Sequence, residues 1–241
     1  SMFSNSVNGG TAASLELSAS GWGDDPNATA EIDPLNVVQP GTKNVRISHC
    51  VFQDLTIIVS SSCDFSNCVF TRCKFTKAIN AVFNNCTFYD TLNNTLGTDN
   101  SLSINKSFVM YTRTGALFTA SSNALVSVKN SLVRPILATL GTQTEALIVT
   151  EDNGNCIVDA ITIPANSGVN STLDTKGLAA VAVRCDGGSA SVSNLSIVGG
   201  TTLCSLVSGN GANIKLGNIG STTTGAGPII STFNSTVNID T

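Results

Sequence analysis

The chain has 241 residues, of which 41% are hydrophobic and only 12% are charged, and its formal net charge is −4. Ser, Thr, Asn and Gly take the place of charged residues, a composition typical of short strands separated by many tight turns. The small negative charge argues against partners such as nucleic acid or an anionic membrane. No apolar run approaches the roughly 18 to 20 residues that cross a bilayer, so we expect no membrane insertion.

Residues 1–36 are rich in Gly, Ser, Asn and Asp and predict an irregular N-terminal segment. Within it, the alternating residues Leu15–Leu17 form a candidate first rung of the domain that follows. Val37 and Val38 open that domain, and a Pro-Gly corner separates them from Val45-Arg-Ile47, which alternates like a strand. We therefore divide the chain into an N-terminal segment, residues 1–36, and one β-domain, residues 37–241.

A short apolar pattern, called the repeat below, returns at a fixed interval between residues 45 and 90. Its first three copies are centred on Ile47, Phe65 and Phe83, and Cys50, Cys68 and Cys86 each follow one of these centres at the same offset. Within both sets, every member follows the one before it at the same interval along the chain. Self-similarity at a short period is the mark of a solenoid, in which each repeat buries its apolar face only against its neighbours.

The repeat can be followed to the end of the chain, at intervals that vary from roughly 18 to roughly 34 residues. Its predicted centres are Ile47, Phe65, Phe83, Ile104, Val128, Val158, Val192, Ile214 and Val237. An apolar residue stands two positions before every centre except Val237, where Ser235 breaks the pattern, and this alternation predicts a strand with one buried face. The two residues after the centre hold Ser, Asn, Lys or Asp in most repeats and predict a tight bend, because Asn and Asp tolerate left-handed backbone geometry.

A further apolar segment precedes many of these repeats and predicts another strand. These segments are Leu117-Phe118, Ala146–Val149, Leu178–Val183, Leu203–Val207 and Ile229-Ile230. Each repeat then contributes about three strands, and the repeats stack by parallel pairing. The predicted fold is all-β, a right-handed parallel β-helix (solenoid) of about nine rungs, each of roughly 18–34 residues. A sandwich or barrel remains an alternative, although neither explains a pattern that stays in step nine times.

Residues 63–77 tighten into groups of five, Cys63-Asp-Phe65-Ser-Asn, Cys68-Val-Phe70-Thr-Arg and Cys73-Lys-Phe75-Thr-Lys. This stretch resembles the pentapeptide-repeat family, but three-residue steps at 60–62 and 78–80 interrupt it, and it extends over residues 45–90 only. The chain as a whole resembles the right-handed β-helices of phage tailspikes and fibres, of polysaccharide lyases and pectinases, and of bacterial surface passengers. That resemblance concerns the fold and does not imply one function.

The eight cysteines mostly occupy positions that Ala, Val, Ile or Leu take in other repeats. Because free Cys is among the most buried residue types, we expect reduced core cysteines rather than disulfides. No CxxC pair occurs and His49 is the only histidine in the sequence, so we expect no zinc site, and we expect no other metal and no cofactor. His49 itself falls in a bend.

Carboxylates offer no predicted catalytic residue. Asp54, Arg72 and Asp90 recur at the interval of the first three repeats, so we expect a ladder of alternating charge that neutralises itself. Glu151, Asp152 and Asp186 fall at matching corners and could bind a cation, although solvated turns are the favoured interpretation. The candidate binding residues are the few aromatic groups suited to sugar, Trp22, Tyr89 and Tyr111, together with Arg72.

Two segments, Ser131–Leu137 and Leu178–Val183, carry apolar or small residues on both strand faces, which predicts a covering neighbour and most simply a homotrimer. We expect a non-enzymatic domain of a viral or phage fibre or spike, on the virion surface or extracellular, that attaches to a host-surface glycan or protein receptor. One alternative is a polysaccharide-cleaving enzyme with a site between subunits or near Pro164–Lys176. Another is a DNA mimic that binds a topoisomerase, which the basic Arg72, Lys74 and Lys77 disfavour.

Overall fold

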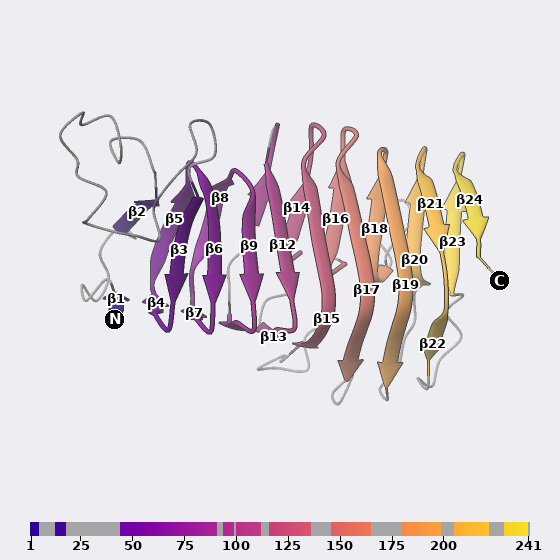
Figure 1. Ribbon diagram of the computed structural model, residues 1–241. Coiled ribbons are helices and arrows are strands. Elements are labelled where there is room, and N and C mark those ends of the chain that lie inside the picture. The colour runs from indigo at the N-terminus through magenta and orange to yellow at the C-terminus, as the bar shows by residue number, and fades with distance from the viewer. Residues whose placement is uncertain are drawn as a thin grey trace.

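The computed structural model describes residues 1–4, 13–17, 44–90, 94–98, 100–111, 116–135, 146–164, 180–198, 205–221 and 229–240. All regular elements within these ranges are β-strands. Figure 1 shows them stacked side by side along one direction, with the N-terminal strands at one end and the C-terminal strands at the other. Trp22 and the Val37-Val38 pair lie outside the described residues.

The largest sheet contains fifteen strands. They are β1 (Met2–Ser4), β3 (Asn44–Ser48), β4 (Val51–Gln53), β6 (Ser62–Ser66), β7 (Val69–Thr71), β9 (Ala81–Asn84), β10 (Thr87–Tyr89), β12 (Ser101–Asn105), β13 (Phe108–Tyr111), β15 (Leu125–Pro135), β17 (Asn155–Pro164), β19 (Ser189–Val198), β21 (Asn213–Leu216), β22 (Ile219–Ser221) and β24 (Thr236–Ile239). It consists of two rows of strands that the long strands β15, β17 and β19 join, because each of them belongs to both rows.

Two smaller sheets complete the stack. The six-stranded sheet contains β11 (Asn94–Leu96), β14 (Phe118–Ala120), β16 (Ile148–Glu151), β18 (Ala180–Asp186), β20 (Ser205–Asn210) and β23 (Ile230–Phe233). The three-stranded sheet contains β2 (Ala13–Leu17), β5 (Leu55–Val59) and β8 (Lys74–Ala78). The strands predicted upstream of the repeats are thereby confirmed, since each of the five apolar segments contributes to β14, β16, β18, β20 or β23.

Each strand pairs in parallel with the strand one repeat away. In the first row, Ile47 pairs with Phe65, Phe65 with Phe83, and Phe83 with Ile104. The register continues through Val128 and Val158 to Val192 and so confirms the first seven predicted centres. An all-β structure with long parallel sheets of this kind is compatible with a parallel β-helix.

The predicted bends are also confirmed. The second residue after the centre has a left-handed backbone, with φ between 48° and 54°, in seven successive repeats, at His49, Asn67, Asn85, Lys106, Asn130, Ala160 and Asn194. L-residues adopt this region at a cost that Asn lowers by bonding its own backbone, which explains why Asn dominates the position. His49 is therefore a bend residue, as expected.

The last two predicted centres are wrong by two residues. Val192 pairs with Leu216 rather than Ile214, and Leu216 pairs in turn with Ile239 rather than Val237. Strict alternation cannot distinguish a strand from the same strand moved by two residues, because both place the same face inward. The composition of the two residues after the centre is the better marker, since Gly217-Asn218 follows Leu216, whereas Lys215-Leu216, which includes an apolar residue, follows Ile214.

The N-terminal strands are only partly expected from the sequence. Leu15–Leu17 lies in β2, which pairs with β5 and agrees with a first rung. Met2–Ser4, for which the sequence predicts no strand, forms β1 beside β4, and Phe3 stacks on Phe52 with ring centroids 5.2 Å apart. The division of the chain at residue 36 stays a prediction.

The core is a column of aromatic and aliphatic side chains between the sheets. Phe52, Phe70 and Phe88 stack in register with ring centroids 4.9 and 5.1 Å apart, and Phe65 stacks on Phe83 at 4.7 Å. All five rings are at most 1% exposed. The described cysteines are buried in this core except Cys50, which is half-buried, and this confirms their predicted location.

The two segments that suggested a neighbouring subunit behave differently. In β18, Ala182 and Val183 are both buried within the single chain, so these two residues do not need a partner to cover them. In β15, Val133 is buried, whereas Leu132 points outward and is 38% exposed. Of the described parts of the two segments, Leu132 alone still supports an apolar contact with a second chain.

Candidate functional site

The structure brings two of the four predicted binding residues together. Tyr89 ends β10 with 40% of its surface exposed, and its carbonyl oxygen accepts a hydrogen bond of 2.8 Å from the Arg72 amide one repeat earlier. Tyr111 ends the neighbouring strand β13, where the backbone is described and the side chain is not. Tyr89 and Arg72 therefore share one exposed corner, whereas Trp22 lies outside the described residues.

The Arg72 guanidinium at this corner is held by Asp54. Its Nε and Nη2 atoms donate to the two oxygens of Asp54 at 2.6 and 2.8 Å, a bidentate geometry. Hydrogen bonding to Arg72 lowers the pKa of Asp54, and the same pair raises the pKa of Arg72. The predicted charge ladder is thus confirmed for its first two members, and an incoming anion would have to compete with Asp54 for the guanidinium.

A second corner joins β16 and β18. Arg184 lies between the carboxylates of Glu151 and Asp186, with its Nη2 4.0 Å from Glu151 Oε1 and its Nε 3.5 Å from Asp186 Oδ2. Glu151 and Asp186 pair in register, and Arg184 precedes Asp186 by two residues, so all three side chains share one strand face. The sequence analysis did not identify Arg184, although its position two residues before Asp186 indicates that both side chains lie on the same strand face.

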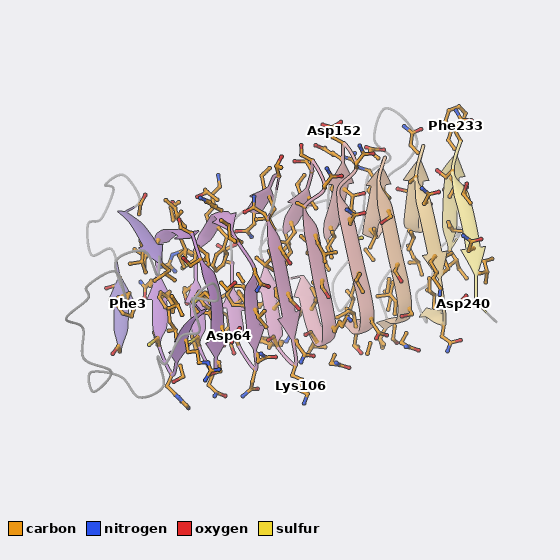
Figure 2. All side chains as sticks on the ribbon, turned by 45° about the horizontal axis from the view of Figure 1, so that its top comes forward. Phe3, Asp64, Lys106, Asp152, Phe233 and Asp240 are labelled. Carbon is orange, nitrogen blue, oxygen red and sulfur yellow. The ribbon has the colours of Figure 1, made fainter. Side chains whose placement is uncertain are left out.

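The cation alternative for this corner receives no support from the geometry. Two of the three carboxylates face Arg184, and Asp152 projects from an exposed turn (Figure 2). Within the described ranges, no group of three His, Cys, Asp or Glu side chains is positioned to hold a metal ion. Asp152 is therefore a turn residue, whose φ of 45° places it in the left-handed region.

A shallow groove of about 350 Å³ crosses the outer face of β17, β19 and β21. Its lining includes Asn155, Ser189 and Asn213 in one column, and Ile157, Ser191 and Lys215 in the next. The groove is hollow because the small Ser189 and Ser191 lie between larger residues of the flanking strands. Sequence reasoning did not identify this groove.

Two polar side chains of the groove, those of Ser189 and Lys215, are held by contacts with neighbouring side chains. Ser189 Oγ donates to Asn155 Oδ1 at 2.6 Å, and Lys215 Nζ lies 2.8 Å from Asp240 Oδ2 at the C-terminal end of the stack (Figure 2). Amide, hydroxyl and ammonium groups beside the aliphatic Ile157 can donate and accept hydrogen bonds and also contact an apolar surface. Apolar atoms make up most of the exposed lining, so the groove suits an uncharged ligand that offers both hydroxyl groups and an apolar face.

Elsewhere on the surface, asparagine side chains stabilise the stack itself. Asn105 Nδ2 donates to Asn84 Oδ1 at 3.2 Å, and Asn130 Nδ2 donates to Asn105 Oδ1 at 2.9 Å. These ladders link successive repeats along the bends. Their amides already pair with one another, so the Asn-rich bends are structural.

The described residues include no helix suited to spanning a membrane. Comparison of the chain with protein-family models, with curated proteins and with solved structures finds no match.

Proposed function

We propose that the chain folds as a right-handed parallel β-helix of about nine rungs, of the kind seen in phage tailspikes and fibres, with a pentapeptide-like stretch at residues 45–90. Parallel pairing in register, which occurs in each of the three sheets, supports this proposal. The repeated left-handed bends support it as well, because they turn the chain at one fixed position in successive repeats.

We further propose that this domain is a non-catalytic attachment module of a viral or phage fibre or spike, exposed on the virion surface, and that it binds a host-surface glycan. The observation that carries the proposal is the groove over β17, β19 and β21, with its amide, hydroxyl and lysine lining. Hydroxyl-rich sugars bind through several such hydrogen bonds. A protein receptor on the host surface is the alternative partner of the same domain.

A homotrimer would present three such grooves and raise the affinity for a multivalent surface by avidity. Leu132 supports this assembly, together with the outward and half-buried Val51, Val69 and Phe108 of the same row of strands. Light scattering at micromolar concentration would give three times the 24.8 kDa of one chain, and a monomer would contradict the assembly.

A glycan array probed with the purified protein tests the attachment proposal. Ser191→Tyr fills the groove and is expected to lower binding to any recognised glycan at least tenfold. Ser103→Tyr is the matched control, because Ser103 occupies the same outward column on β12, away from the groove, and should leave binding unchanged. If no glycan is bound, or if both variants bind like the original protein, the groove is not the attachment site.

The polysaccharide-cleaving alternative is favoured by one observation, the pairing in register of Glu151 and Asp186, which places two carboxylates on one strand face. Glycoside hydrolysis ordinarily uses such a pair, although Arg184 contacts both of them here. A reducing-end assay with candidate polysaccharides decides between the two functions. Release of reducing ends that Glu151→Gln abolishes would establish the enzyme and displace the non-catalytic proposal.

A further inference from the structure

Three cysteines occupy one position in three successive repeats. The Val69 amide donates to the Cys50 carbonyl and the Thr87 amide to the Cys68 carbonyl, both at 2.9 Å, so the corners that hold the cysteines are stacked in register. Cys68 and Cys86 are each 1% exposed, whereas Cys50 is half-buried at the N-terminal end of the series. The stack therefore contains an enclosed pair of thiols, Cys68 and Cys86.

The two enclosed thiols point in the same direction. Cys68 Sγ lies 3.7 Å from the carbonyl oxygen of Ile47, and Cys86 Sγ lies 3.7 Å from that of Phe65, which is the equivalent residue one repeat later. Each sulfur thus reaches toward the preceding repeat, so the Cys86 thiol is directed toward the corner that holds Cys68. Adjacent paired strands are about 4.8 Å apart, which falls inside the range of about 4.4 to 6.8 Å that separates Cα atoms joined by a disulfide.

The two thiols differ in acidity. The hydrogen bond from Cys86 lowers the pKa of Cys68 despite its burial, and the same contact raises the pKa of Cys86. Cys63 and Cys73 are near Cys68 in sequence and provide a contrast, because burial raises their pKa values to about 12 and about 11. Cys63 also pairs with Val45 and Ala81, so no thiol lies beside it in the adjacent strands. A thiolate is the reactive form of cysteine, which singles out Cys68.

We propose that Cys68 and Cys86 are a redox-active dithiol that hydrogen peroxide converts into a disulfide joining two successive repeats. The Cys68 thiolate attacks one peroxide oxygen, the O–O bond breaks, and Cys68 becomes a sulfenic acid as hydroxide leaves. The Cys86 sulfur then attacks the Cys68 sulfur, so that an S–S bond forms and the S–O bond breaks. The two thiol protons combine with the two hydroxides that leave, so two thiols lose two electrons and one peroxide becomes two waters.

The burial of the pair is compatible with this reaction, because hydrogen peroxide is small and uncharged. Burial also restricts the outcome, since a sulfenic acid at Cys68 meets the Cys86 thiol before it meets a second peroxide molecule. The disulfide would close a loop between neighbouring repeats and stabilise the stack by restricting the unfolded chain.

Mass spectrometry of the folded protein after peroxide treatment tests the proposal. We expect the number of alkylatable thiols to fall from eight to six. After trypsin, the cross-link should join the peptide 47–72, which holds Cys68, to the peptide 78–106, which holds Cys86. Cys50→Ala, Cys63→Ala and Cys73→Ala should retain this cross-link, whereas Cys68→Ala should abolish it.

Three results would overturn the proposal. One is a cross-link confined to peptide 47–72, which would make Cys50 or Cys63 the partner. Another is persistence of the 47–72 to 78–106 cross-link in Cys68→Ala, and the third is oxidation to sulfinic acid without any cross-link. Peptide mapping of the unsubstituted protein needs no variant to fold, and a rise in melting temperature on oxidation that dithiothreitol reverses provides a second readout.

Discussion

Phe83 lies at the centre of the aromatic core, and its replacement by alanine provides the sharpest test of how the stack is stabilised. Its ring is 0% exposed and contacts four others, stacking on Phe65 at 4.7 Å and meeting Phe70, Phe75 and Phe88 edge-on at 5.2 to 5.4 Å. Removal of a buried phenylalanine side chain costs about 3–5 kcal/mol of unfolding free energy. We expect a value near the upper end, because paired strands on both sides restrict collapse of the cavity.

Two further variants separate the contribution of ring packing from that of hydrophobicity. Ile104 occupies the position of Phe83 in the following repeat, so the column accepts an aliphatic side chain and Phe83→Leu should cost only about 1.5 kcal/mol. Phe233 is the matched control, since it is 61% exposed near the C-terminal end of the stack, and Phe233→Ala should change stability by about 0.5 kcal/mol or less.

The assay is guanidinium unfolding followed by far-UV circular dichroism, with midpoints compared among the three variants. We expect the highest guanidinium midpoint for Phe233→Ala, a lower one for Phe83→Leu and the lowest for Phe83→Ala. Equal midpoints for the two alanine variants would show that the aromatic column does not stabilise the fold, and the packing argument would then be wrong.

Two other perturbations test the electrostatics and the backbone. Arg72→Met should cost about 0.5 kcal/mol at neutral pH, because the pair with Asp54 is largely exposed. Since the pKa of Asp54 is lowered in the folded protein, its contribution is present above its ordinary value of 3.8 and is lost as pH falls through the folded value. The midpoint difference from the unsubstituted protein should therefore vanish in acid, and a difference that persists would contradict the ion pair. Gly188→Ala should destabilise far more than Gly211→Ala, for which about 1 kcal/mol of left-handed strain is expected. At Gly188 the new Cβ would lie 2.0 Å from the Gly154 carbonyl oxygen, whereas at Gly211 nothing lies within 4 Å, so equal thermal stabilities would refute this close approach.

The inward-facing half of the fold was readable from the sequence because it follows local rules. Apolar alternation located the strands, and the polar pair located bends whose left-handed φ values recur at one position. Both signals lie within a few residues of each centre, so the intervals of variable length between repeats did not disturb them.

The sequence did not predict which polar side chains are buried, because their burial depends on hydrogen bonds between repeats. Asn94 is 0% exposed, and its side chain accepts a hydrogen bond from the Phe75 amide at 2.6 Å while donating to the Leu117 carbonyl at 3.0 Å. It thereby links β8 to the residue that precedes β14, and these two strands flank β11 but belong to different sheets. From the sequence alone, an asparagine in a chain so rich in this residue indicates a turn or a bend.

The groove was not predicted because its lining depends on which residues of adjacent strands are neighbours, and the predicted register of one strand was wrong. Its first column requires Asn155, Ser189 and Asn213 to be neighbours, although the interval from Asn155 to Ser189 is longer than that from Ser189 to Asn213. With Ile214 as the eighth centre, the second interval becomes shorter still, and Ser189 would stand beside Gly211 instead. An error of two residues leaves the buried face unchanged, because apolar residues still point inward. It reassigns the outward neighbours of β21, however, and a surface that binds a ligand is composed of outward neighbours. In a repeat architecture with variable intervals, fold prediction is therefore robust to a two-residue shift in register that places the wrong residues of β21 beside Ser189 and Ser191. The bend residues, which fix the register independently of the apolar alternation, are the feature from which such a site should be sought.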